Sequence, residues 1–456
     1  MTTTPSTDIG VRESFARDAS GLVCIPESVA RPESQDEVVE VLRQAAADRV
    51  PVTAAGGQTS TTGASISEQG MILSLRALDR VLGIDEERRT VRVESGVLLG
   101  PLKRQLAAEG WLLAPDPTSE EDVTIGGAVA CNASGARTLR YGAMRAHVAG
   151  LRVLLANGEV HELRRPGLEK NTAGYAFAQD PVDWFVGSEG TLGVVLEAEL
   201  ALLPLPPRVV GIGIPFGSEE AALAFVVVAR DSDAVHPRCL EYFDERALGI
   251  ARGAQGDERW AAGAGALVYV EETSGEDAEP PLEAWLALAE AHGAIADDLL
   301  VFDGESQLRE ARRIRHAVPA YMNERGATYR PAGGRKLSTD WAVPHRKLAV
   351  AIGEARRLAD AAGIEQAVTY GHAGNGHPHQ NFLARDAADR ARIEAVIEET
   401  LRWVLRHGGT VSAEHGIGKL KRKWLPLQAT GMQLGAMRAL KRELDPLGIL
   451  APGNVL

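Results

Sequence analysis

Apolar positions near the start of the chain change from helical to strand-like spacing. Ser34 followed by Glu37 is the pattern of a capping box, and the apolar positions after it recur at the helical period. The apolar or alternating runs 50–54, 71–75 and 90–94 predict short strands. The apolar stripe of the predicted helix consists of Val38, Val39, Leu42 and Ala45. We therefore expect the first part of the chain to contain both helices and strands.

The same block continues with a helix, a hairpin and a linker. Apolar spacing predicts a helix over 101–109. The runs 151–155 and 159–163 flank Asn157-Gly158, a pair that predicts a hairpin with a two-residue turn. The proline-rich segment 203–207 is typical of a linker. The first block should therefore end near this segment.

The second block alternates predicted strands and helices. Strands are expected at 209–214, 240–243, 266–271 and 299–302, and helices at 219–231, 282–292 and 307–323. That order suits an antiparallel sheet with helices on one face. A last helix is expected over 432–444.

Composition limits the classes of function. A length of 456 residues predicts two or three domains, and a formal charge of −13 argues against nucleic acid or an anionic membrane as the main partner. The widely spaced Cys24, Cys131 and Cys239 form no metal or iron–sulfur motif. No apolar run reaches about 18 residues, and the first residues lack a signal-peptide pattern. We therefore expect a cytoplasmic protein without a transmembrane segment, with loose peripheral attachment to a membrane as the alternative.

The segment 369–418 carries the strongest chemical signal. His372 and His379 flank a glycine-rich turn, and Glu414 and His415 follow in a second glycine-flanked segment. Two imidazoles and a carboxylate can bind zinc, manganese or iron, and they leave His415 for proton transfer. The alternative is that the histidines are hydrogen-bonded strand residues without a ligand. The joint pattern favours an enzyme site with a divalent metal, with zinc as the first candidate.

Glycine-rich loops in the first block indicate a phosphate-bearing cofactor. The loop 56–63 follows a predicted strand, and the segments 115–127, 132–142 and 187–193 have the same character. Glycines let several backbone N–H groups approach a phosphate, although turn formation is the alternative for any single loop. The missing strand–GxGxxG–helix unit disfavours a Rossmann site, and the missing GxxxxGK(S/T) motif excludes a P-loop. Several such loops together predict a dinucleotide.

These motifs, above all Gly187–Gly193 and Glu414–Gly418, resemble those of the FAD-linked D-2-hydroxyacid dehydrogenases. That branch of the vanillyl-alcohol oxidase superfamily includes D-lactate dehydrogenase, the glycolate oxidase D subunit and D-2-hydroxyglutarate dehydrogenase. The resemblance implies an α+β fold with a two-subdomain PCMH-type FAD-binding domain and a ferredoxin-like cap domain with an antiparallel sheet and helices. The implied parts are an N-terminal extension (1–25), the FAD-binding domain (26–206), the substrate-binding cap domain with the metal site (207–425) and a segment returning to the FAD domain (426–456).

The resemblance also places non-covalent FAD on the first block, because no His or Cys that could attach the flavin occurs between Val50 and Ser67. The family usually has Arg where Ala55 stands and often Gly or Ala where Gln58 stands, so part of the charge compensation for the pyrophosphate is missing. The implied cofactor-binding residues are Ala55, Gly56, Gly57, Gln58, Thr59, Ser60, Gly63, Pro115, Asp116, Thr118, Ile125, Gly126, Gly127, Asn132, Ser134, Gly135, Tyr141, Gly142, Glu189, Gly190, Gly193, Val194 and Asn454.

The resemblance assigns His372, His379 and Glu414 as metal ligands and His415 as the base. His377 stands where the family commonly has Asn, so it is either an extra ligand or a bystander.

For the substrate carboxylate, Arg315 is the first candidate and Lys336 the second, and Asn381 is a further substrate contact. Arg330 and Arg335 are nearby competitors, and a solvated helix face is the alternative for the arginine cluster around Arg315.

Together these assignments predict an FAD-dependent enzyme that oxidises a D-2-hydroxy acid, such as D-lactate, glycolate or D-2-hydroxyglutarate, to the 2-oxo acid. The metal would lower the pKa of the hydroxyl, His415 would take its proton, and flavin N5 would accept the hydride. Electrons would pass to a quinone, a cytochrome, an electron-transfer flavoprotein or oxygen. The alternatives are an FAD-binding subunit of a larger complex and a metal-dependent hydrolase; whether the chain forms a homodimer is left open.

Overall fold

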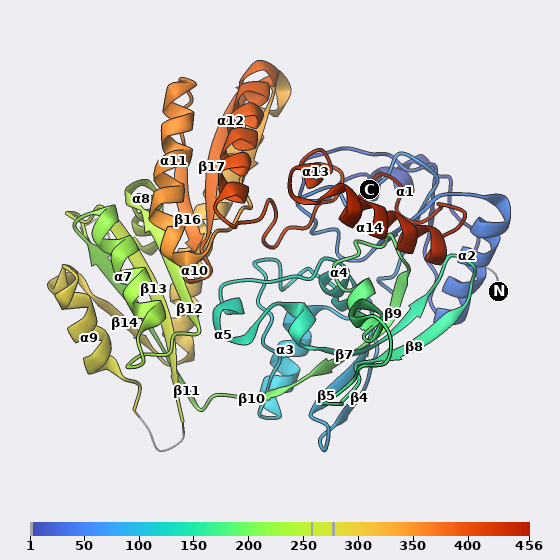
Figure 1. Cartoon of the computed structure of the whole chain (residues 1–456), viewed down its shortest axis with the longest axis horizontal. Coiled ribbons are helices and arrows are strands. Elements are labelled where there is room, and N and C mark those ends of the chain that lie inside the picture. The colour runs from blue at the N-terminus through green and yellow to red at the C-terminus, as the bar shows by residue number, and fades with distance from the viewer. Residues whose placement is uncertain (1–2, 257–258, 276–278) are drawn as a thin grey trace. The chain divides into compact units, whose positions relative to one another are not determined.

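The computed structural model describes residues 3–256, 259–275 and 279–456. The chain divides into two units (Figure 1), each with its own core. The first unit contains Met1–Ser134, Gly142–Leu205 and Glu414–Leu456, and the second contains Gly135–Tyr141 and Pro206–Ala413. The last segment of the first unit thus starts at Glu414, whereas the sequence pattern suggested 426.

The first unit is built on two main sheets. Its strands are β1 (Ser28–Ala30), β2 (Val52–Ala55), β3 (Met71–Ser74), β4 (Val81–Asp85), β5 (Thr90–Glu94), β6 (Trp111–Leu112), β7 (Val148–Leu154), β8 (Val160–Arg164), β9 (Val194–Ala201) and β10 (Leu203–Pro204). Its helices are α1 (Ile9–Ser14), α2 (Gln35–Asp48), α3 (Leu99–Ala108), α4 (Ile125–Ala130), α6 (Val182–Phe185), α13 (Leu425–Gln428) and α14 (Gly431–Leu444).

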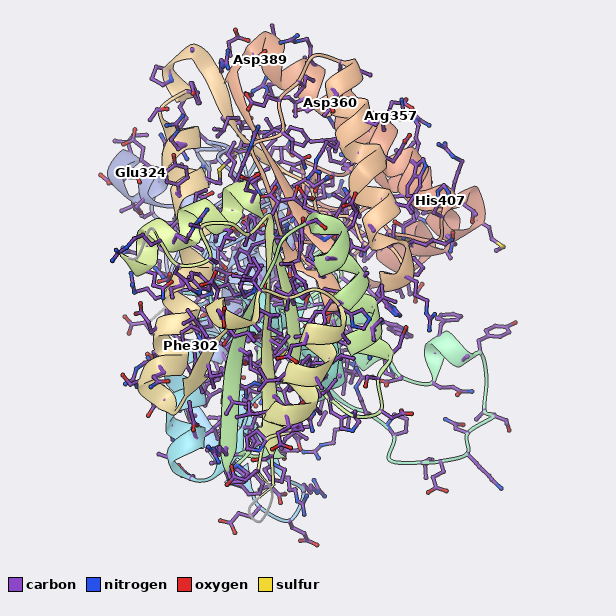
Figure 2. All side chains as sticks on the ribbon, turned by 90° about the vertical axis from the view of Figure 1, so that its left-hand side faces the viewer. Phe302, Glu324, Arg357, Asp360, Asp389 and His407 are labelled. Atoms are coloured by element: carbon purple, nitrogen blue, oxygen red, sulfur yellow. The ribbon has the colours of Figure 1, made fainter. Side chains whose placement is uncertain are left out.

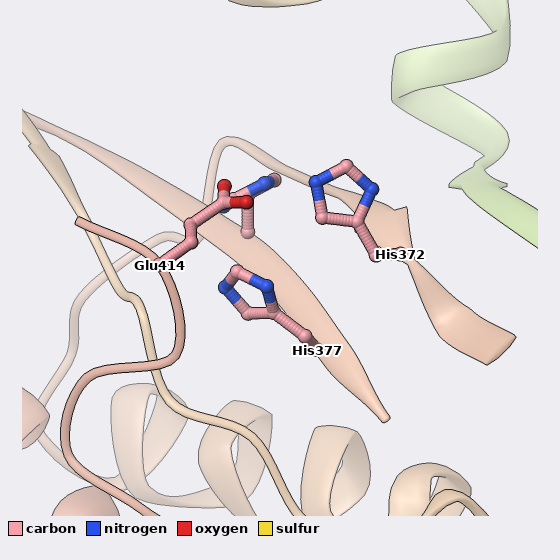
Figure 3. A group of neighbouring side chains, drawn as sticks. His372, His377 and Glu414 are labelled. Atoms are coloured by element: carbon pink, nitrogen blue, oxygen red, sulfur yellow. The ribbon is translucent and has the colours of Figure 1, made fainter. Parts of the chain in front are cut away.

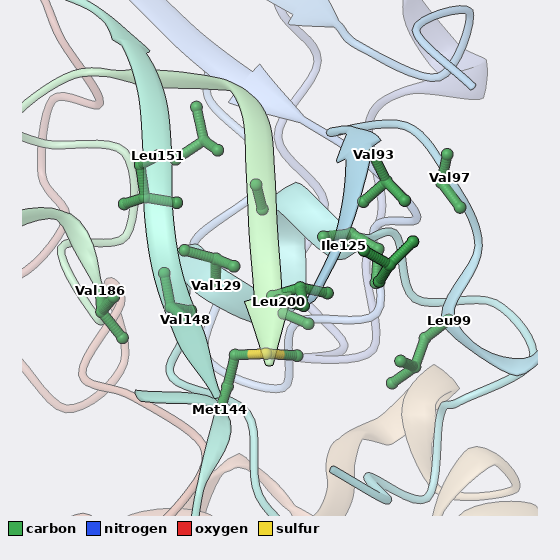
Figure 4. Close-up of a cluster of buried hydrophobic side chains, with 14 of the residues drawn as sticks. Val93, Val97, Leu99, Ile125, Val129, Met144, Val148, Leu151, Val186 and Leu200 are labelled. Atoms are coloured by element: carbon green, nitrogen blue, oxygen red, sulfur yellow. The ribbon is translucent and has the colours of Figure 1, made fainter. Parts of the chain in front are cut away.

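This unit contains two separate main sheets. One is parallel, in the order β1-β3-β2, and the other is antiparallel, in the order β4-β5-β9-β7-β8. Val93 and Leu200 of the antiparallel sheet share one buried cluster with Leu99 of α3 and Ile125 of α4 (Figure 4). The C-terminal tail extends the parallel sheet, because Leu450 forms a parallel bridge to Val52 of β2. This tail therefore lies next to the strand that leads into the loop 56–63.

Local sequence signals explain much of this unit. Ser34 caps α2 by accepting from the backbone N–H of Glu37, but the Glu37 carboxylate accepts from Glu33 and Thr3, so only half of the predicted capping box forms. The predicted hairpin is β7–β8, with Asn157-Gly158 in its turn. The region 115–142, which gave no helical signal, contains α4 and the short helix α5 (Thr138–Tyr141).

The second unit contains one large antiparallel sheet in the order β14-β11-β13-β12-β16-β17-β15. Its strands are β11 (Arg208–Phe216), β12 (Cys239–Asp244), β13 (Ala266–Ser274), β14 (Leu300–Asp303), β15 (Gly333–Ser338), β16 (Val368–His372) and β17 (His377–Asp386). Its longer helices are α7 (Glu219–Asp231), α8 (Glu245–Gln255), α9 (Leu282–Ala291), α10 (Glu305–Ala327), α11 (Leu348–Ala361) and α12 (Ala387–Arg406).

Helices cover both faces of this sheet, so the expectation of helices on one face was wrong. Tyr269 of β13 lies in a buried cluster with residues of α8 and α10, whereas Phe216 of β11 contacts Phe225 of α7. Phe216 is opposite Ala266 in the register and therefore points away from Tyr269. Figure 2 shows Glu324 of α10 and Arg357 of α11 on opposite sides of the unit. The central strands are consequently buried at nearly every position, including their charged residues.

No helix in the described part of the chain combines the length and the apolar character needed to cross a membrane. The predicted two-domain α+β architecture is confirmed, with a parallel and an antiparallel sheet in one unit and a large antiparallel sheet in the other.

Candidate cofactor and metal sites

The loop after β2 presents a row of backbone donors. From Gly56 to Ser60, no backbone N–H group has a hydrogen-bond acceptor among the described residues, and the loop is half-buried. A Cβ on Gly57 would lie 2.0 Å from the carbonyl oxygen of Asp122, so this close packing requires glycine. Adjacent backbone donors without acceptors form an anion-binding site. The loop therefore fits a pyrophosphate, and its individual contacts to FAD stay a prediction.

Gln58 attaches this loop to the N-terminal segment. Its Nε2 donates to the carbonyl oxygens of Phe15 and Arg17 at 3.1 and 3.2 Å. Its φ of 54° lies in the left-handed region, which non-glycine residues adopt infrequently. The side chain that departs from the family pattern therefore positions the loop through neutral hydrogen bonds and adds no positive charge to it.

The other predicted cofactor residues occupy loops that are fixed by hydrogen bonds. Thr124 caps α4 by accepting from the N–H of Gly127, and Lys103 donates to the carbonyl oxygen of Pro115. Asn132, at a φ of 50°, accepts from the N–H of Arg145. Gly135 and Tyr141 belong to the second unit, and the remaining predicted cofactor residues belong to the first.

Glu189 supports the segment that follows His415. Its carboxylate accepts from the backbone N–H groups of Ile417 at 2.6 Å and Gly418 at 2.7 Å. Burial raises the pKa of Glu189, although these two hydrogen bonds act in the opposite direction. The carboxylate is thus engaged by the protein itself, and the predicted contact of Glu189 with the cofactor stays a prediction.

Asn454 links the C-terminal tail to three parts of the first unit. Its Nδ2 donates to the carbonyl oxygens of Ala64 at 2.8 Å and Glu189 at 3.2 Å. Its Oδ1 accepts from Lys419 at 2.6 Å, and the same ammonium donates to the carbonyl oxygen of Gly63. One buried side chain therefore holds the end of the loop 56–63 next to the segment after His415.

The histidines of the second unit lie on one hairpin, β16–β17. His372 is directly opposite His377, and Tyr370 is opposite His379, so the register places all three imidazoles on the same face. All three are buried. Gly371 has a φ of 132°, and a Cβ there would lie 2.9 Å from Cδ2 of His379. A side chain at position 371 would therefore displace an imidazole.

Two buried carboxylates contact these imidazoles. Glu241 of β12 accepts from Nδ1 of His372 at 2.7 Å and from Nε of Arg315 at 2.7 Å. Oδ1 of Asp340 lies 3.2 Å from Nε2 of His377. Burial alone would raise the pKa of Glu241, but Arg315 and His372 outweigh it and lower the pKa to about 2. Because Glu241 holds Nδ1 of His372, Nε2 is the nitrogen that this ring can offer to a cation.

Glu414 directly follows the second unit in the chain. The backbone N–H of the preceding Ala413 donates to the carbonyl oxygen of Asp340 within that unit. His372, His377, His379 and Glu414 each offer one ligand atom, and these atoms all lie within 4.8 Å of one another (Figure 3). Imidazole and carboxylate donors at this spacing fit zinc, manganese or iron.

The remaining predicted site residues have distinct environments. Nε2 of His415 lies 3.5 Å from Oε1 of Glu414, and its backbone carbonyl accepts from Thr62. Arg315 pairs with Glu241, and Asn381 follows His379 by two residues on β17, so it lies on the same face of the strand. Burial lowers the pKa of Lys336 to about 8. The role of each toward substrate or proton stays a prediction.

Sequence reasoning missed Glu241 and Asp340. Glu241 lies between Leu240 and Tyr242 in a run that was expected to be a strand. A lone carboxylate in an apolar strand was a usable signal, because buried charges are normally paired. Its partner His372 is 131 positions further along the chain, so the pairing itself was not visible.

Comparison with known proteins assigns this chain to a family. Residues 205–455 match the family model described as FAD linked oxidases, C-terminal domain, and residues 26–164 match the FAD binding domain model. A D-lactate dehydrogenase from Archaeoglobus fulgidus is 32% identical over 94% of this chain and 91% of that protein. A D-2-hydroxyglutarate dehydrogenase from Xanthomonas citri is 31% identical over 94% of this chain and 89% of its own length.

Glycolate oxidase subunit GlcD from Bacillus subtilis is 30% identical over 94% of this chain and 89% of that protein. A solved structure of alkyldihydroxyacetonephosphate synthase has a TM-score of 0.75 at 18% identity, covering 98% of this chain and 82% of the other, and shows a shared fold. The C-terminal domain match alone spans more than half of the residues, and the predicted family resemblance is confirmed. The chain therefore belongs to the FAD-linked oxidases and is an FAD-dependent oxidoreductase.

Proposed function

We propose that this enzyme oxidises a D-2-hydroxy acid to the corresponding 2-oxo acid. The observation that carries the proposal is that one chain has both an FAD-binding domain and a buried imidazole cluster of the kind that binds a divalent cation. Relatives over nearly the full length are named for D-lactate and D-2-hydroxyglutarate. A flavin can accept the hydride of this oxidation, and a divalent cation can lower the pKa of the substrate hydroxyl.

In this proposal the first unit holds FAD through the N–H groups of the loop 56–63. Bound flavin supplies a hydride acceptor at N5. The ring orientation of His372 is fixed by Glu241, which leaves Nε2 free of a proton for the cation. A bound divalent cation would lower the pKa of the substrate hydroxyl. His379 and Glu414 complete the predicted ligand set.

His415 is the proposed base. A neutral imidazole can accept the hydroxyl proton near neutral pH, and Nε2 of His415 lies 3.5 Å from the Glu414 carboxylate of the predicted ligand set. Glu189 holds the backbone immediately after His415, so this ring is attached to a fixed segment. The proposed proton acceptor, His415, is therefore attached to a backbone segment that Glu189 holds by two hydrogen bonds.

For the substrate carboxylate, Lys336 is favoured over Arg315. Arg315 is already paired with Glu241, whereas Lys336 has no hydrogen bond or ion pair within the described part of the chain. Its ammonium is charged below about pH 8 and lacks a protein counter-ion. Asn381, with its Oδ1 lacking a hydrogen-bond partner among the described residues, is a further proposed contact that would accept from a hydroxyl of the substrate and not bind the carboxylate.

The test is anaerobic flavin reduction by a panel of D- and L-2-hydroxy acids. The D-enantiomers should bleach the flavin band and yield the 2-oxo acid. His415→Ala should retain FAD but be reduced about 10²–10⁴-fold more slowly, as expected for loss of a general base. His161→Ala, on the exposed strand β8, is the matched control. Reduction of His415→Ala at the normal rate would exclude this base, and no bleaching by any hydroxy acid would refute the proposed reaction.

A second candidate function is suggested by one relative, which is named as a subunit of glycolate oxidase. In that case the chain would hold FAD but would need partner subunits for turnover. Reduction of the flavin in the isolated chain by a D-hydroxy acid would exclude this dependence for the reductive half-reaction. Reoxidation by a quinone, a cytochrome or an electron-transfer flavoprotein would then identify the class of electron acceptor.

A further inference from the structure

We propose that His377 is a ligand of the cation, so that three imidazoles of one hairpin and the carboxylate of Glu414 form the site. The inference deepens the proposed function, because it concerns the cation site of that reaction. It concerns one residue, His377, whose role as a ligand or a bystander the sequence leaves open.

The first argument is placement. His377 is opposite His372 in the hairpin register, and His379 is the next residue on the same face of β17. Its donor atom belongs to the same group within 4.8 Å as those of His372, His379 and Glu414. The close-up in Figure 3 shows the imidazoles of His372 and His377 and the Glu414 carboxylate directed toward a common centre. The three imidazoles come from a single hairpin, so local strand pairing places them on one face.

The second argument is the distance between rings. A nitrogen about 2.1 Å from a metal puts the ring centroid about 3.2 Å away, so two such centroids lie about 5.2 Å apart at a tetrahedral angle and about 4.5 Å apart at a right angle. The observed separations are 5.4 Å for His372–His377, 5.2 Å for His372–His379 and 4.6 Å for His377–His379. His377 fits a shared cation as well as the two predicted ligands do.

The third argument is hydrogen bonding. His377 is 4% exposed, and neither ring nitrogen has a hydrogen-bond partner among the described residues; Nε2 lies 3.2 Å from Asp340 without hydrogen-bond geometry. A buried polar ring without a partner is costly unless something satisfies it. Nε2 lies beside the Asp340 carboxylate, so we infer that Nδ1 is the nitrogen that binds the cation. Glu241 on His372 and Asp340 on His377 would then be matching carboxylate partners of two ligands.

The coordination number has a consequence for the metal. Three nitrogens and one carboxylate oxygen fill a tetrahedron, whereas catalytic zinc sites usually have three protein ligands and an open position. The 4.6 Å separation of the His377 and His379 ring centroids corresponds to an angle near 90° at a shared cation, which is smaller than the tetrahedral value and compatible with a fifth ligand. We therefore expect a tightly held cation that increases its coordination number when substrate binds.

The experiment is Co²⁺ binding by the FAD-loaded enzyme after removal of other metals. His377→Ala and His377→Asn should weaken Co²⁺ binding by about 100-fold or more, since even outer partners of ligands contribute 10–100-fold. The intensity of the visible Co²⁺ bands, which depends on coordination number, should also change. Asp340→Asn should weaken Co²⁺ binding less than the His377 variants do, because Asp340 lies beside a ligand and does not bind the cation itself. His292→Ala, at the end of α9 in the same unit, where its Nδ1 lies 2.8 Å from the carbonyl oxygen of Leu288, is the matched control.

The outcomes separate this inference from the proposed function. If His377→Ala binds Co²⁺ with the affinity and spectrum of the unaltered enzyme, His377 is not a ligand, and the three-ligand site of the proposed function survives. If the unaltered enzyme binds no divalent cation, the cation step of the proposed function fails together with this inference. Flavin absorbance and far-UV circular dichroism of each variant show whether a lost cation reflects loss of folding.

Discussion

Replacing Glu241 by Gln should remove both stability and cation affinity. Glu241 is 1% exposed and contacts Arg315 and His372 at 2.7 Å each. The lowering of its pKa from 4.5 to about 2 corresponds to about 3 kcal/mol of preference for the ionised carboxylate in the folded state. Glu241→Gln also leaves the Arg315 guanidinium without its counter-ion, and losses of about 3–5 kcal/mol are usual when one partner of a buried pair is removed.

The pH dependence of stability identifies the source of this loss. Because the folded-state pKa of Glu241 lies below the unfolded value, its contribution is fully present above about pH 4.5 and is lost as the pH falls toward 2. Urea unfolding followed by tryptophan fluorescence suits the measurement, since Trp260, Trp285, Trp341 and Trp403 belong to this unit. The free energy of unfolding of Glu241→Gln should be lower at pH 7 and should fall less between pH 4.5 and 2.

The same variant should bind Co²⁺ about 10–100-fold more weakly, because Gln holds Nδ1 of His372 less firmly than a carboxylate does. Glu290→Gln, at an exposed position of α9, is the matched control and should change neither quantity. A loss below about 1 kcal/mol at pH 7, together with unchanged Co²⁺ affinity, would refute the idea that this buried pair orients His372.

Three further predictions test other parts of the site. Gly57→Ala should lower FAD occupancy, measured by flavin absorbance, because its Cβ would collide with the carbonyl oxygen of Asp122, whereas Gly167→Ala, with open space around it, should not. The KM for the hydroxy acid should rise about tenfold per pH unit above about pH 8 as Lys336 loses its proton, and Lys336→Met should raise KM at pH 7 and remove this dependence. Asn454→Ala should cost about 1–3 kcal/mol and lower the thermal midpoint, with partial recovery on adding FAD, because Ala64 and Glu189 lose a buried donor. A KM that stays constant between pH 7 and 9.5 would exclude Lys336 as the carboxylate partner.

Local sequence signals were sufficient for many of the elements, but not for α4, α5, α8, α11 and α12. His372 and His379 are seven positions apart around a glycine turn, so one hairpin brings them together without any long-range contact. Glu241 could not be assigned in the same way, because its contact with His372 depends on the pairing of β12 with β16. The pairing of two strands that are far apart in the sequence cannot be predicted from the spacing of apolar residues within either strand.

The helix arrangement was predicted wrongly for a related reason. The expectation of helices on one face rested on the order of strands and helices along the chain, and that order does not say which face of the sheet each helix covers. In the structure helices cover both faces, and the strand carboxylates Glu241 and Glu271 are buried in ion pairs, Glu241 with Arg315 and Glu271 with Arg137 and Arg238. The partners of these carboxylates lie outside the strands that carry them, so spacing within a strand does not reveal them.

The buried charges around the hairpin point to a requirement for orientation. Removing charges from water costs several kcal/mol per ion, and apolar residues of similar volume often stabilise a core at least as well. The Glu241–Arg315 pair nevertheless lies beside His372, and Asp340 lies beside His377, so both carboxylates contact imidazoles of the same cluster. Each carboxylate can fix a ring and select the nitrogen that faces the centre, which an apolar side chain cannot do. The charge placement is thus best explained by a cation whose ligands must be held before it binds, and double variants that replace Glu241 and Arg315 together by apolar residues should keep stability while losing Co²⁺ affinity.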